Sequence, residues 1–312
     1  MTKVPFLICI YFLIGVFSSP AIGQHSETET KLFSFGVLAD VQYADVEQVG
    51  KRNYRGSLEK LVNSIQGMNQ YELSFIASLG DLIDRDFESF ASPLALISEA
   101  RAPIHHVLGN HEFSVKDNLK KEVPGLLNNP KKYYSFETHG FVMVILNGME
   151  ESMGAYPEDS NKHREGLDKY EHLKSKGANN AQTWNGGLGK KQFQWLGKVL
   201  TRADKMGHQV ILFNHFPLLP ENGLQLWENR EVLEMLNKHQ SVVAYFSGHH
   251  HEGNYVEENG IHHLTFKGMV EAMSDSSYGI IDVYKDRLVI NGFGDQEDRI
   301  LKFGLERMDS GK

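Results

Sequence analysis

The stretch Leu73-Ser74-Phe75-Ile76-Ala77-Ser78-Leu79-Gly80-Asp81 contains the pattern that decides the fold of this chain. Its apolar run predicts a buried strand, and its glycine permits a tight turn that places the carboxylate of Asp81 at the end of the strand. Four other apolar runs are also followed by residues of the kinds that bind metal ions. These runs lead to Asp40-Val41-Gln42, Gly109-Asn110-His111-Glu112, Asn214-His215 and Gly248-His249-His250-His251.

The segments between these runs have the apolar periodicity of amphipathic helices. The expected strands cover residues 32–38, 73–79, 104–108, 210–213 and 242–246, and the expected helices cover 54–68, 87–100, 190–206 and 227–237. Alternation of strands and helices predicts parallel strands in an α/β fold. The carboxyl ends of such strands share one crevice, which is where open α/β sheets bind their ligands.

Two regions depart from this alternation. Beyond Asn254, short alternating runs at 261–266, 278–284 and 287–291 predict antiparallel strands and hairpins. Residues 150–189 are polar, rich in glycine and poor in periodicity, which predicts a long loop. Long loops inside compact domains are commonly functional, so we interpret this segment as an insertion that contacts the substrate.

Length and composition favour one large domain. The chain has 312 residues, 41% of them hydrophobic, and no linker interrupts the motifs between residues 40 and 251. The formal net charge is −8, with lysine and arginine scattered along the sequence. Nucleic-acid-binding surfaces need clustered positive charge, so we expect no nucleic-acid partner.

The N-terminal residues resemble a signal peptide. An apolar run at 4–17 follows Lys3 and leads into small residues before Gln24. We therefore expect residues 1–23 to be removed near Gly23, leaving 24–312 as the exported domain, periplasmic or secreted and without a membrane span. The alternative is an uncleaved anchor, although the run is shorter than the roughly 20 residues that a span prefers. The only cysteine, Cys9, lies in this segment, so the mature chain would contain no disulfide.

The residues at the predicted strand ends form a complete set of metal donors. Asp81 offers a carboxylate that can bridge two cations, Asn110 an amide oxygen, and His215, His249 and His251 imidazole nitrogens. In an extended chain, His249 and His251 would project to the same side and could each bind one of two adjacent metals. Two divalent cations stabilise both the attacking and the leaving oxygen of a displacement at phosphorus. The expected reaction is therefore metal-assisted hydrolysis of a phosphate ester or anhydride.

The order of these motifs resembles the calcineurin-like metallophosphoesterase superfamily. Most members have a histidine where this chain has Gln42. That difference, together with the segments Arg52-Asn53-Tyr54-Arg55-Gly56-Ser57-Leu58, Trp184-Asn185-Gly186-Gly187-Leu188 and Gly260-Ile261-His262-His263-Leu264-Thr265, resembles the manganese-dependent ADP-ribose and CDP-alcohol diphosphatases.

The resemblance implies a four-layer α/β/β/α sandwich with two facing mixed sheets. It implies that one metal is bound by Asp40, Gln42, Asp81 and His251, and the other by Asp81, Asn110, His215 and His249. It also implies that His111 faces the substrate phosphate. Because Gln42 offers a harder donor than imidazole, we expect the metals to be Mn²⁺, with Mg²⁺ and Fe²⁺ as alternatives, in preference to Zn²⁺.

The expected mechanism is in-line attack on phosphorus by a hydroxide that bridges the two metals. His111 would stabilise the transition state or protonate the leaving oxygen. Tyr54 and Arg55 could reach a phosphate at the edge of the site, or could instead belong to a helical turn packed beneath the first motif. Asn185 could contact a substrate, or could simply lead into the next helix.

The expected substrate is a small phosphorylated molecule linked to a nucleoside diphosphate, such as ADP-ribose or a CDP-alcohol. An exported enzyme would meet CDP-alcohols or nucleotide sugars more readily than ADP-ribose, which is chiefly intracellular. The nearest alternative is a phosphodiesterase or phosphomonoesterase of the same superfamily. A metal-binding scaffold without catalytic activity is a further alternative, disfavoured because it would not need His111 beside a complete donor set.

Overall fold

The computed structural model describes residue 1 and residues 30–304. All of its helices and strands belong to one compact unit that begins at Lys31. The strands are β1 (Phe33–Leu38), β2 (Ile76–Ser78), β3 (Ile104–His106), β4 (Tyr134–Thr138), β5 (Phe141–Ile145), β6 (Gln209–Phe213), β7 (Val242–Ser247), β8 (Asn254–Glu258), β9 (Ile261–Thr265), β10 (Ser277–Val283), β11 (Arg287–Gly294) and β12 (Arg299–Lys302). The α-helices are α1 (Ser57–Met68), α2 (Ala91–Ile97), α3 (Val123–Leu126), α4 (Asn161–Ser175), α5 (Lys190–Met206) and α6 (Asn229–Asn237). Short 3₁₀ helices are η1 (Glu88–Phe90), η2 (His111–Phe113), η3 (Asp117–Glu122) and η4 (Met269–Glu271).

The strands form two mixed six-stranded sheets. The first has the order β12-β11-β10-β1-β2-β3, and the second has the order β4-β5-β6-β7-β9-β8. The runs β1-β2-β3 and β5-β6-β7-β9 are parallel, whereas the remaining neighbours are antiparallel. The parallel strands predicted from the alternating pattern are therefore present in both sheets.

The two sheets face each other across an apolar core rich in aromatic side chains. Phe35 from β1 stacks on Phe75 with ring centroids 4.8 Å apart and meets Phe213 of β6 edge-on at 5.9 Å. All six residues of β1 are buried, because one of its faces covers this inner core and the other lies under helices. Burial on both faces explains why the strand is mostly apolar rather than alternating, with Ser34 as its only polar side chain.

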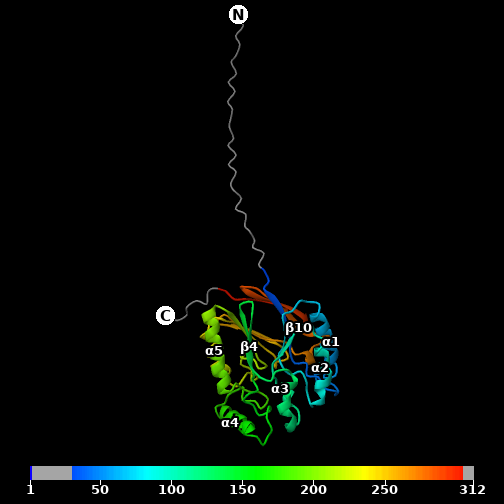
Figure 1. Cartoon of the computed structure of the whole chain (residues 1–312). Helices are drawn as coiled ribbons and strands as arrows, with labels where there is room; N and C mark the ends of the chain where they lie inside the picture. Colours follow the sequence, from blue (N-terminus) through cyan, green and yellow to red (C-terminus); the bar gives the residue numbers. More distant parts are fainter. Residues whose placement is uncertain (2–29, 305–312) are drawn as a thin grey trace. The chain divides into compact units, whose positions relative to one another are not determined.

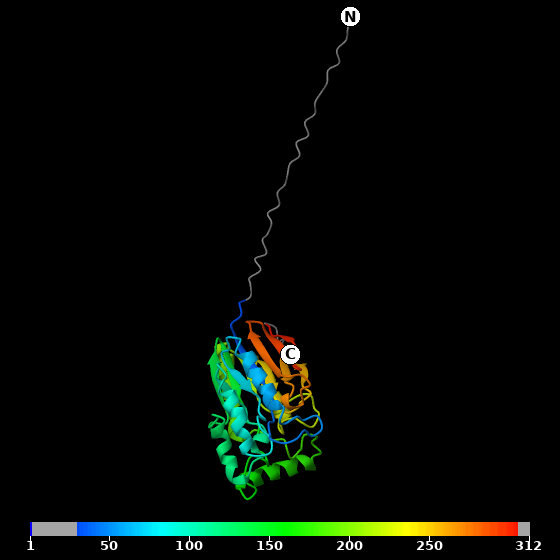
Figure 2. The same ribbon diagram turned by 90° about the vertical axis from the view of Figure 1, so that its right-hand side faces the viewer.

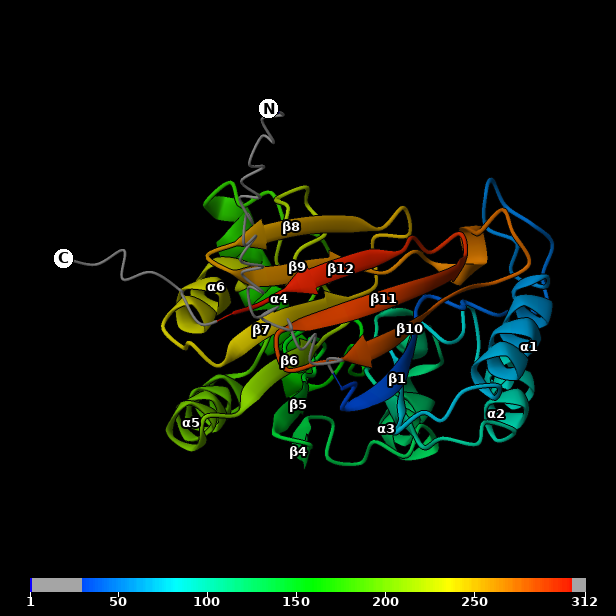
Figure 3. The ribbon, with the colours of Figure 1, turned by 90° about the horizontal axis from the view of Figure 1, so that it is seen from above.

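Helices cover the outer faces of the sheets. Figure 3 shows α1 and α2 at one side of the molecule and α5 and α6 at the opposite side, with the sheets between them. Helix α5 buries Leu196, Leu200 and Ala203, which lie three or four residues apart and so share one helix face. It ends at Gly207, whose φ of +67° is left-handed and suits a glycine. The expected four-layer α/β/β/α sandwich is confirmed.

The segment 150–189 differs from the expected loop because it contains the helix α4. Its N-cap Ser160 accepts a hydrogen bond from the backbone of His163, which satisfies a free N–H of the first turn. Only Gly166 is buried along α4, so the helix has almost no apolar face and left no periodic signal in the sequence. Figures 1 and 2 place α4 (green) beyond the sheets, at the end toward which β1 runs.

A second difference concerns β9, which was expected in an antiparallel hairpin. It pairs antiparallel with β8 but parallel with β7, and so extends the parallel part of the second sheet. Apart from residue 1, the expected signal peptide, 1–23, lies outside the described residues. Within residues 30–304, no helix has the length and apolar character that crossing a membrane requires.

Candidate metal centre

The predicted donor residues from both sheets meet at the carboxyl ends of their strands. Four of them have left-handed backbone conformations, with φ of +51° at Asp40, +44° at Gln42, +55° at Asp81 and +69° at His249. Such angles are uncommon outside glycine and cost energy, so surrounding contacts must hold them. The chain therefore turns sharply just beyond each strand and directs these side chains into one cluster.

One group of donor atoms surrounds Nε2 of His215. This nitrogen lies 3.2 Å from Asp81 Oδ2, 3.2 Å from Asn110 Oδ1 and 3.1 Å from His249 Nδ1. The other ring nitrogen of His215, Nδ1, contacts the carbonyl oxygen of Leu79 at 2.8 Å. A carbonyl oxygen can only accept, so Nδ1 carries the proton and Nε2 is the nitrogen available to a cation.

A second group surrounds Gln42. Its Nε2 lies 3.2 Å from Asp81 Oδ2 and 3.1 Å from Nε2 of His251. His251 Nε2 also lies 3.6 Å from Asp40 Oδ1. Asp81 is therefore common to both groups, as a bridging carboxylate must be.

The residues present fit two divalent cations. Gln42 Oε1 is buried and has no hydrogen-bond partner among the described residues, so the Gln42 amide keeps one oxygen free to bind a cation. Asp40 and Asp81 are both fully buried, and buried carboxylates require positive charge nearby. Burial lowers the pKa of His215, but the carboxylates of Asp81, Asp40 and Glu112 outweigh it and raise that pKa to about 9. The same negative field that attracts a proton there favours a metal ion.

His111 lies beside the shared carboxylate. Its backbone N–H donates to Asp81 Oδ1 at 2.8 Å, and its ring Nδ1 lies 3.0 Å from Oδ1 of Asp84. Burial lowers the pKa of His111, but Asp81 and Asp84 outweigh it, and the pKa is raised above its usual value. Asp84 holds one end of the ring, so Nε2 is the nitrogen that can serve a substrate.

Glu112 ties two of the strand-end turns together. Its Oε2 accepts hydrogen bonds from the backbone of Gly109 at 2.8 Å and Asp81 at 2.9 Å, and its Oε1 accepts one from Leu82 at 2.6 Å. These bonds support the left-handed turn at Asp81. The sequence offered no signal for this role beyond the position of Glu112 next to His111.

Glu271 supports the other end of the cluster and was not expected to have a role. Its Oε1 lies 3.0 Å from Nδ1 of His251 and 3.3 Å from Nε of Arg52. The short helix η4 that carries Glu271 is held by the buried Lys60, whose ammonium donates to the carbonyls of Met269 at 3.1 Å and Ala272 at 2.6 Å. Sequence patterns gave no indication of this link, because Lys60 and Glu271 are far apart in the chain.

The side chains of the three residues expected near the substrate are engaged by other parts of the chain. Tyr54 is 3% exposed and its hydroxyl accepts a hydrogen bond from Arg85. Arg55 forms ion pairs with the exposed carboxylates of Asp45 and Glu47 at 2.7 and 2.6 Å. Asn185 is fully buried, so its side chain is not available to a substrate.

The turn that carries His249 and His251 is not the expected extended strand. Strand β7 ends at Ser247, and the left-handed His249 donates its backbone N–H to both carboxylate oxygens of Asp40, at 3.0 and 3.1 Å. This turn, rather than strand alternation, brings both rings into the cluster. His250 lies apart from the donor groups, with its Nδ1 3.3 Å from the side-chain nitrogen of Asn222.

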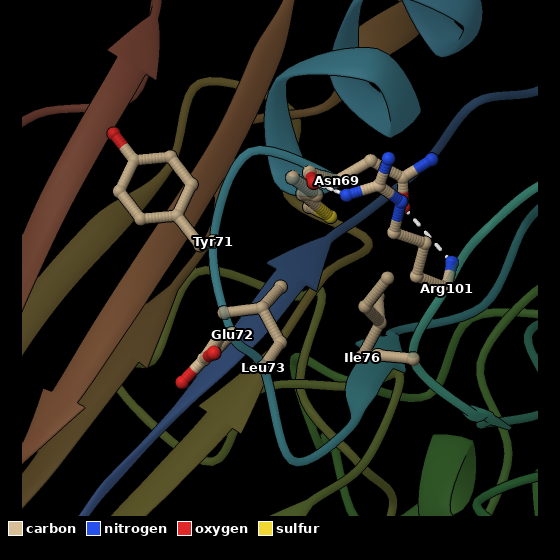
Figure 4. Close-up of a pocket in the computed structure, with 8 residues that line it drawn as sticks. Asn69, Tyr71, Glu72, Leu73, Ile76 and Arg101 are labelled. Carbon is tan, nitrogen blue, oxygen red and sulfur yellow. Dashed lines mark hydrogen bonds between the residues drawn. The ribbon is translucent and has the colours of Figure 1, made fainter.

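A separate pocket of about 300 Å³ lies at the other end of the first sheet, beside Ile76, where β2 begins. Figure 4 shows Arg101 and Glu72 among its lining residues. The guanidinium of Arg101 donates a hydrogen bond to the carbonyl oxygen of Asn69 at 3.0 Å. Ligands of parallel sheets bind at the carboxyl ends of strands, so this pocket is not the candidate centre.

Comparison with known proteins gives concordant results. Residues 33–253 match the model of the calcineurin-like phosphoesterase family. A curated protein named manganese-dependent ADP-ribose/CDP-alcohol diphosphatase from Bos taurus is 30% identical, over 90% of this chain and 97% of its own length. The protein of that name from Arabidopsis thaliana is 32% identical, over 86% of this chain and 96% of its own. The crystal structure of a dimetal phosphatase from Danio rerio superposes with a TM-score of 0.82 at 27% identity, covering 88% of this chain and all of that one.

Proposed function

The chain belongs to the calcineurin-like phosphoesterase family and is a metal-dependent hydrolase of phosphate esters or anhydrides, and from this premise we propose that it cleaves the phosphoanhydride of nucleoside diphosphate derivatives such as ADP-ribose and CDP-alcohols. The observation that carries the proposal is the position of Gln42, whose side chain lies within hydrogen-bond distance of Asp81 and His251 in a cluster of carboxylate, amide and imidazole groups. The near full-length similarity to diphosphatases of that specificity supports it.

We assign the ligands from the two donor groups. The first cation would be held by Asp40, Gln42, Asp81 and His251, and the second by Asp81, Asn110, His215 and His249. When bound, two such cations lower the pKa of water and neutralise charge that develops on phosphate oxygens. The amide oxygens of Gln42 and Asn110 are hard donors that suit Mn²⁺.

His111 is the residue proposed to move a proton. Asp84 orients its ring through Nδ1, and its backbone N–H is held by Asp81, so the imidazole is fixed beside the bridging carboxylate. The protonated ring would donate from Nε2 to the oxygen that leaves phosphorus. Until that transfer, the carboxylate of Asp84 would stabilise the positive charge of the His111 ring.

The test measures the turnover rate of residues 24–312 with Mn²⁺. Four substrates are compared: ADP-ribose, CDP-choline, a cyclic nucleotide and p-nitrophenyl phosphate. Preferential release of AMP or CMP that is lost in Asp81→Ala supports the proposal. Preference for the cyclic nucleotide or the nitrophenyl ester would move the assignment to a phosphodiesterase or a phosphomonoesterase. A chain that binds Mn²⁺ but turns over none of the four would indicate a scaffold.

We also propose that the chain is exported after cleavage near Gly23. The apolar run at 4–17 and the small residues that follow it support this. Mass spectrometry of the protein recovered from outside the cytoplasm of an expressing cell would test it. A mature N-terminus close to Gln24 is the expected result, and a full-length, cell-retained chain would contradict it.

A further inference from the structure

Asn185 occupies a buried position between the segment 150–189 and the candidate metal centre. It lies five residues before α5 and is fully buried. Its Nδ2 donates hydrogen bonds to the carbonyl oxygens of Asn180 at 3.0 Å and Gly223 at 2.9 Å. Because an amide nitrogen can only donate and a carbonyl can only accept, these two bonds fix the orientation of the Asn185 amide.

That orientation leaves Oδ1 of Asn185 facing His249. The distance from Asn185 Oδ1 to His249 Nε2 is 3.1 Å. Since Oδ1 is an acceptor, Nε2 of His249 must carry the ring proton, and Nδ1 keeps its lone pair. Nδ1 is also the atom that lies 3.1 Å from His215 Nε2, within the second donor group.

The neighbouring ligand His251 is held in the opposite way. Glu271 contacts its Nδ1 at 3.0 Å, which leaves Nε2 to face Gln42 and Asp40. The two histidines of one turn thus present different ring nitrogens to the centre. One is held by a carboxylate and the other by a neutral amide, so Asn185 fixes the direction of the His249 ring without adding a negative charge.

We propose that Asn185 is a positioning residue, which holds His249 with Nδ1 toward the second cation. The segment 150–189 then completes the metal centre through Asn185. The inference rests on the ligand assignment within the proposed function. It extends that assignment by giving a metal-supporting task to a residue with no access to substrate.

Asn185→Leu is the test variant, because leucine has a similar volume and cannot accept a hydrogen bond. Loss of a group that orients a metal ligand typically costs 10- to 100-fold in metal affinity. We therefore expect Mn²⁺ affinity at the second site to fall by about 10- to 100-fold, with the first site nearly unchanged. Calorimetric titration of the purified chain with Mn²⁺ measures both sites without requiring turnover.

Asn180→Leu is the matched control. Asn180 is 7% exposed and its Nδ2 donates to the carbonyl oxygens of Leu226 at 2.7 Å and Trp227 at 3.2 Å, so it anchors the same region without contacting His249. Both variants should melt at lower temperature before metal is added. Only Asn185→Leu should also lose affinity at the second site, and equal losses in the two variants would overturn the proposal.

A measurement on the wild-type chain avoids any dependence on folding of the variants. Nitrogen-15 NMR of labelled histidines should show the ring of His249, assigned by comparison with His249→Ala, protonated at Nε2. Protonation at Nδ1 would overturn the proposal. A wild-type chain that binds two Mn²⁺ but does not hydrolyse nucleoside diphosphates would refute the proposed function and leave this inference standing, whereas binding of a single Mn²⁺ would refute the inference.

Discussion

The body of β3 and the end of β6 each place a buried histidine, His106 and His215, and the electrostatic surroundings of these two histidines differ. His106 lies within β3, and burial together with the neighbouring His105 lowers its pKa to about 4. Just beyond the end of β6, the carboxylates of Asp81, Asp40 and Glu112 overcome the effect of burial on His215 and raise its pKa to about 9. Burial alone therefore does not make a histidine a ligand, whereas buried carboxylates beside it create a field that attracts cations.

Two histidines in strand bodies, His262 and His105, have neutral hydrogen-bond partners. His262 in β9 lies 2.9 Å from the hydroxyl of Tyr255 and 2.9 Å from the carbonyl oxygen of Lys302. His105 contacts the hydroxyl of Tyr134 at 2.8 Å and stacks on Phe136. These contacts give His262 and His105 structural roles. The comparison between strand bodies and strand ends leads to four predictions.

The largest effect is expected at the bridging carboxylate. Asp81→Asn removes a negative charge shared by both donor groups, so turnover should fall by about 10³-fold, the upper range for loss of one preorganised electrostatic group. Steady-state kinetics at saturating Mn²⁺ measures this. Asp282→Asn changes a carboxylate within the body of β10 that accepts a hydrogen bond from Ser34, and it should leave turnover close to wild type. Similar losses in both variants would remove the distinction between strand ends and strand bodies.

The next effect concerns His111. His111→Ala removes the proposed proton donor but none of the assigned metal ligands, so turnover should fall by roughly 10²-fold or more while Mn²⁺ binding persists. Calorimetry and kinetics on the same preparation separate the two quantities. His250→Ala is the control, because this neighbouring histidine is turned toward Asn222. An unchanged rate in His111→Ala would exclude His111 from the mechanism.

A smaller effect is expected on stability at acid pH. The folded-state pKa of His106 is about 4, below the usual value of 6.5. Above pH 6.5 the ring is neutral in both the folded and the unfolded chain, so it does not make the free energy of unfolding depend on pH. Between pH 6.5 and 4 the unfolded chain binds a proton that the folded chain does not, and stability falls as the pH falls. At pH 5 the loss in free energy of unfolding is about 2 kcal/mol, since each pKa unit corresponds to about 1.4 kcal/mol.

His106→Leu should remove this part of the acid sensitivity. Urea unfolding of both proteins at pH 7 and pH 5, in the presence of a chelator, measures the difference. The loss of stability between the two pH values should be smaller in the variant by about 2 kcal/mol. Equal losses in the two proteins would show that His106 is not the responsible group.

The smallest effect is a change of metal preference. Gln42→His replaces an amide with an imidazole, a softer donor, at a position whose left-handed φ of +44° histidine tolerates better than most residues. Affinity for Zn²⁺ relative to Mn²⁺ should rise by about 10-fold, the lower end of the range for changes around a bound metal. Competition titration with the two metals measures the ratio. A constant ratio would argue against Gln42 as a ligand.

The predictable parts of the structure are those encoded by local patterns. The apolar run before Asp40 indicated β1, and the amphipathic periodicity at 190–206 indicated α5 with the bounds that the structure has. Helix α4 was not predicted, because its stability comes from Ser160 capping and polar contacts rather than from an apolar face. The parallel pairing of β9 with β7 was also missed, since pairing partners depend on the whole sheet.

The sequence by itself determined the kinds of donor that the site would contain and the strand ends that would carry them, because each motif directly follows its apolar run. It also indicated the family through Gln42 and the motifs around it. The tertiary structure decided which atom of each side chain faces the centre. Ring nitrogens are selected by hydrogen-bond partners that are distant in the chain, such as Asn185 for His249 and Glu271 for His251. Only folding brings those partners within about 3 Å, the distance at which a hydrogen bond can fix a tautomer.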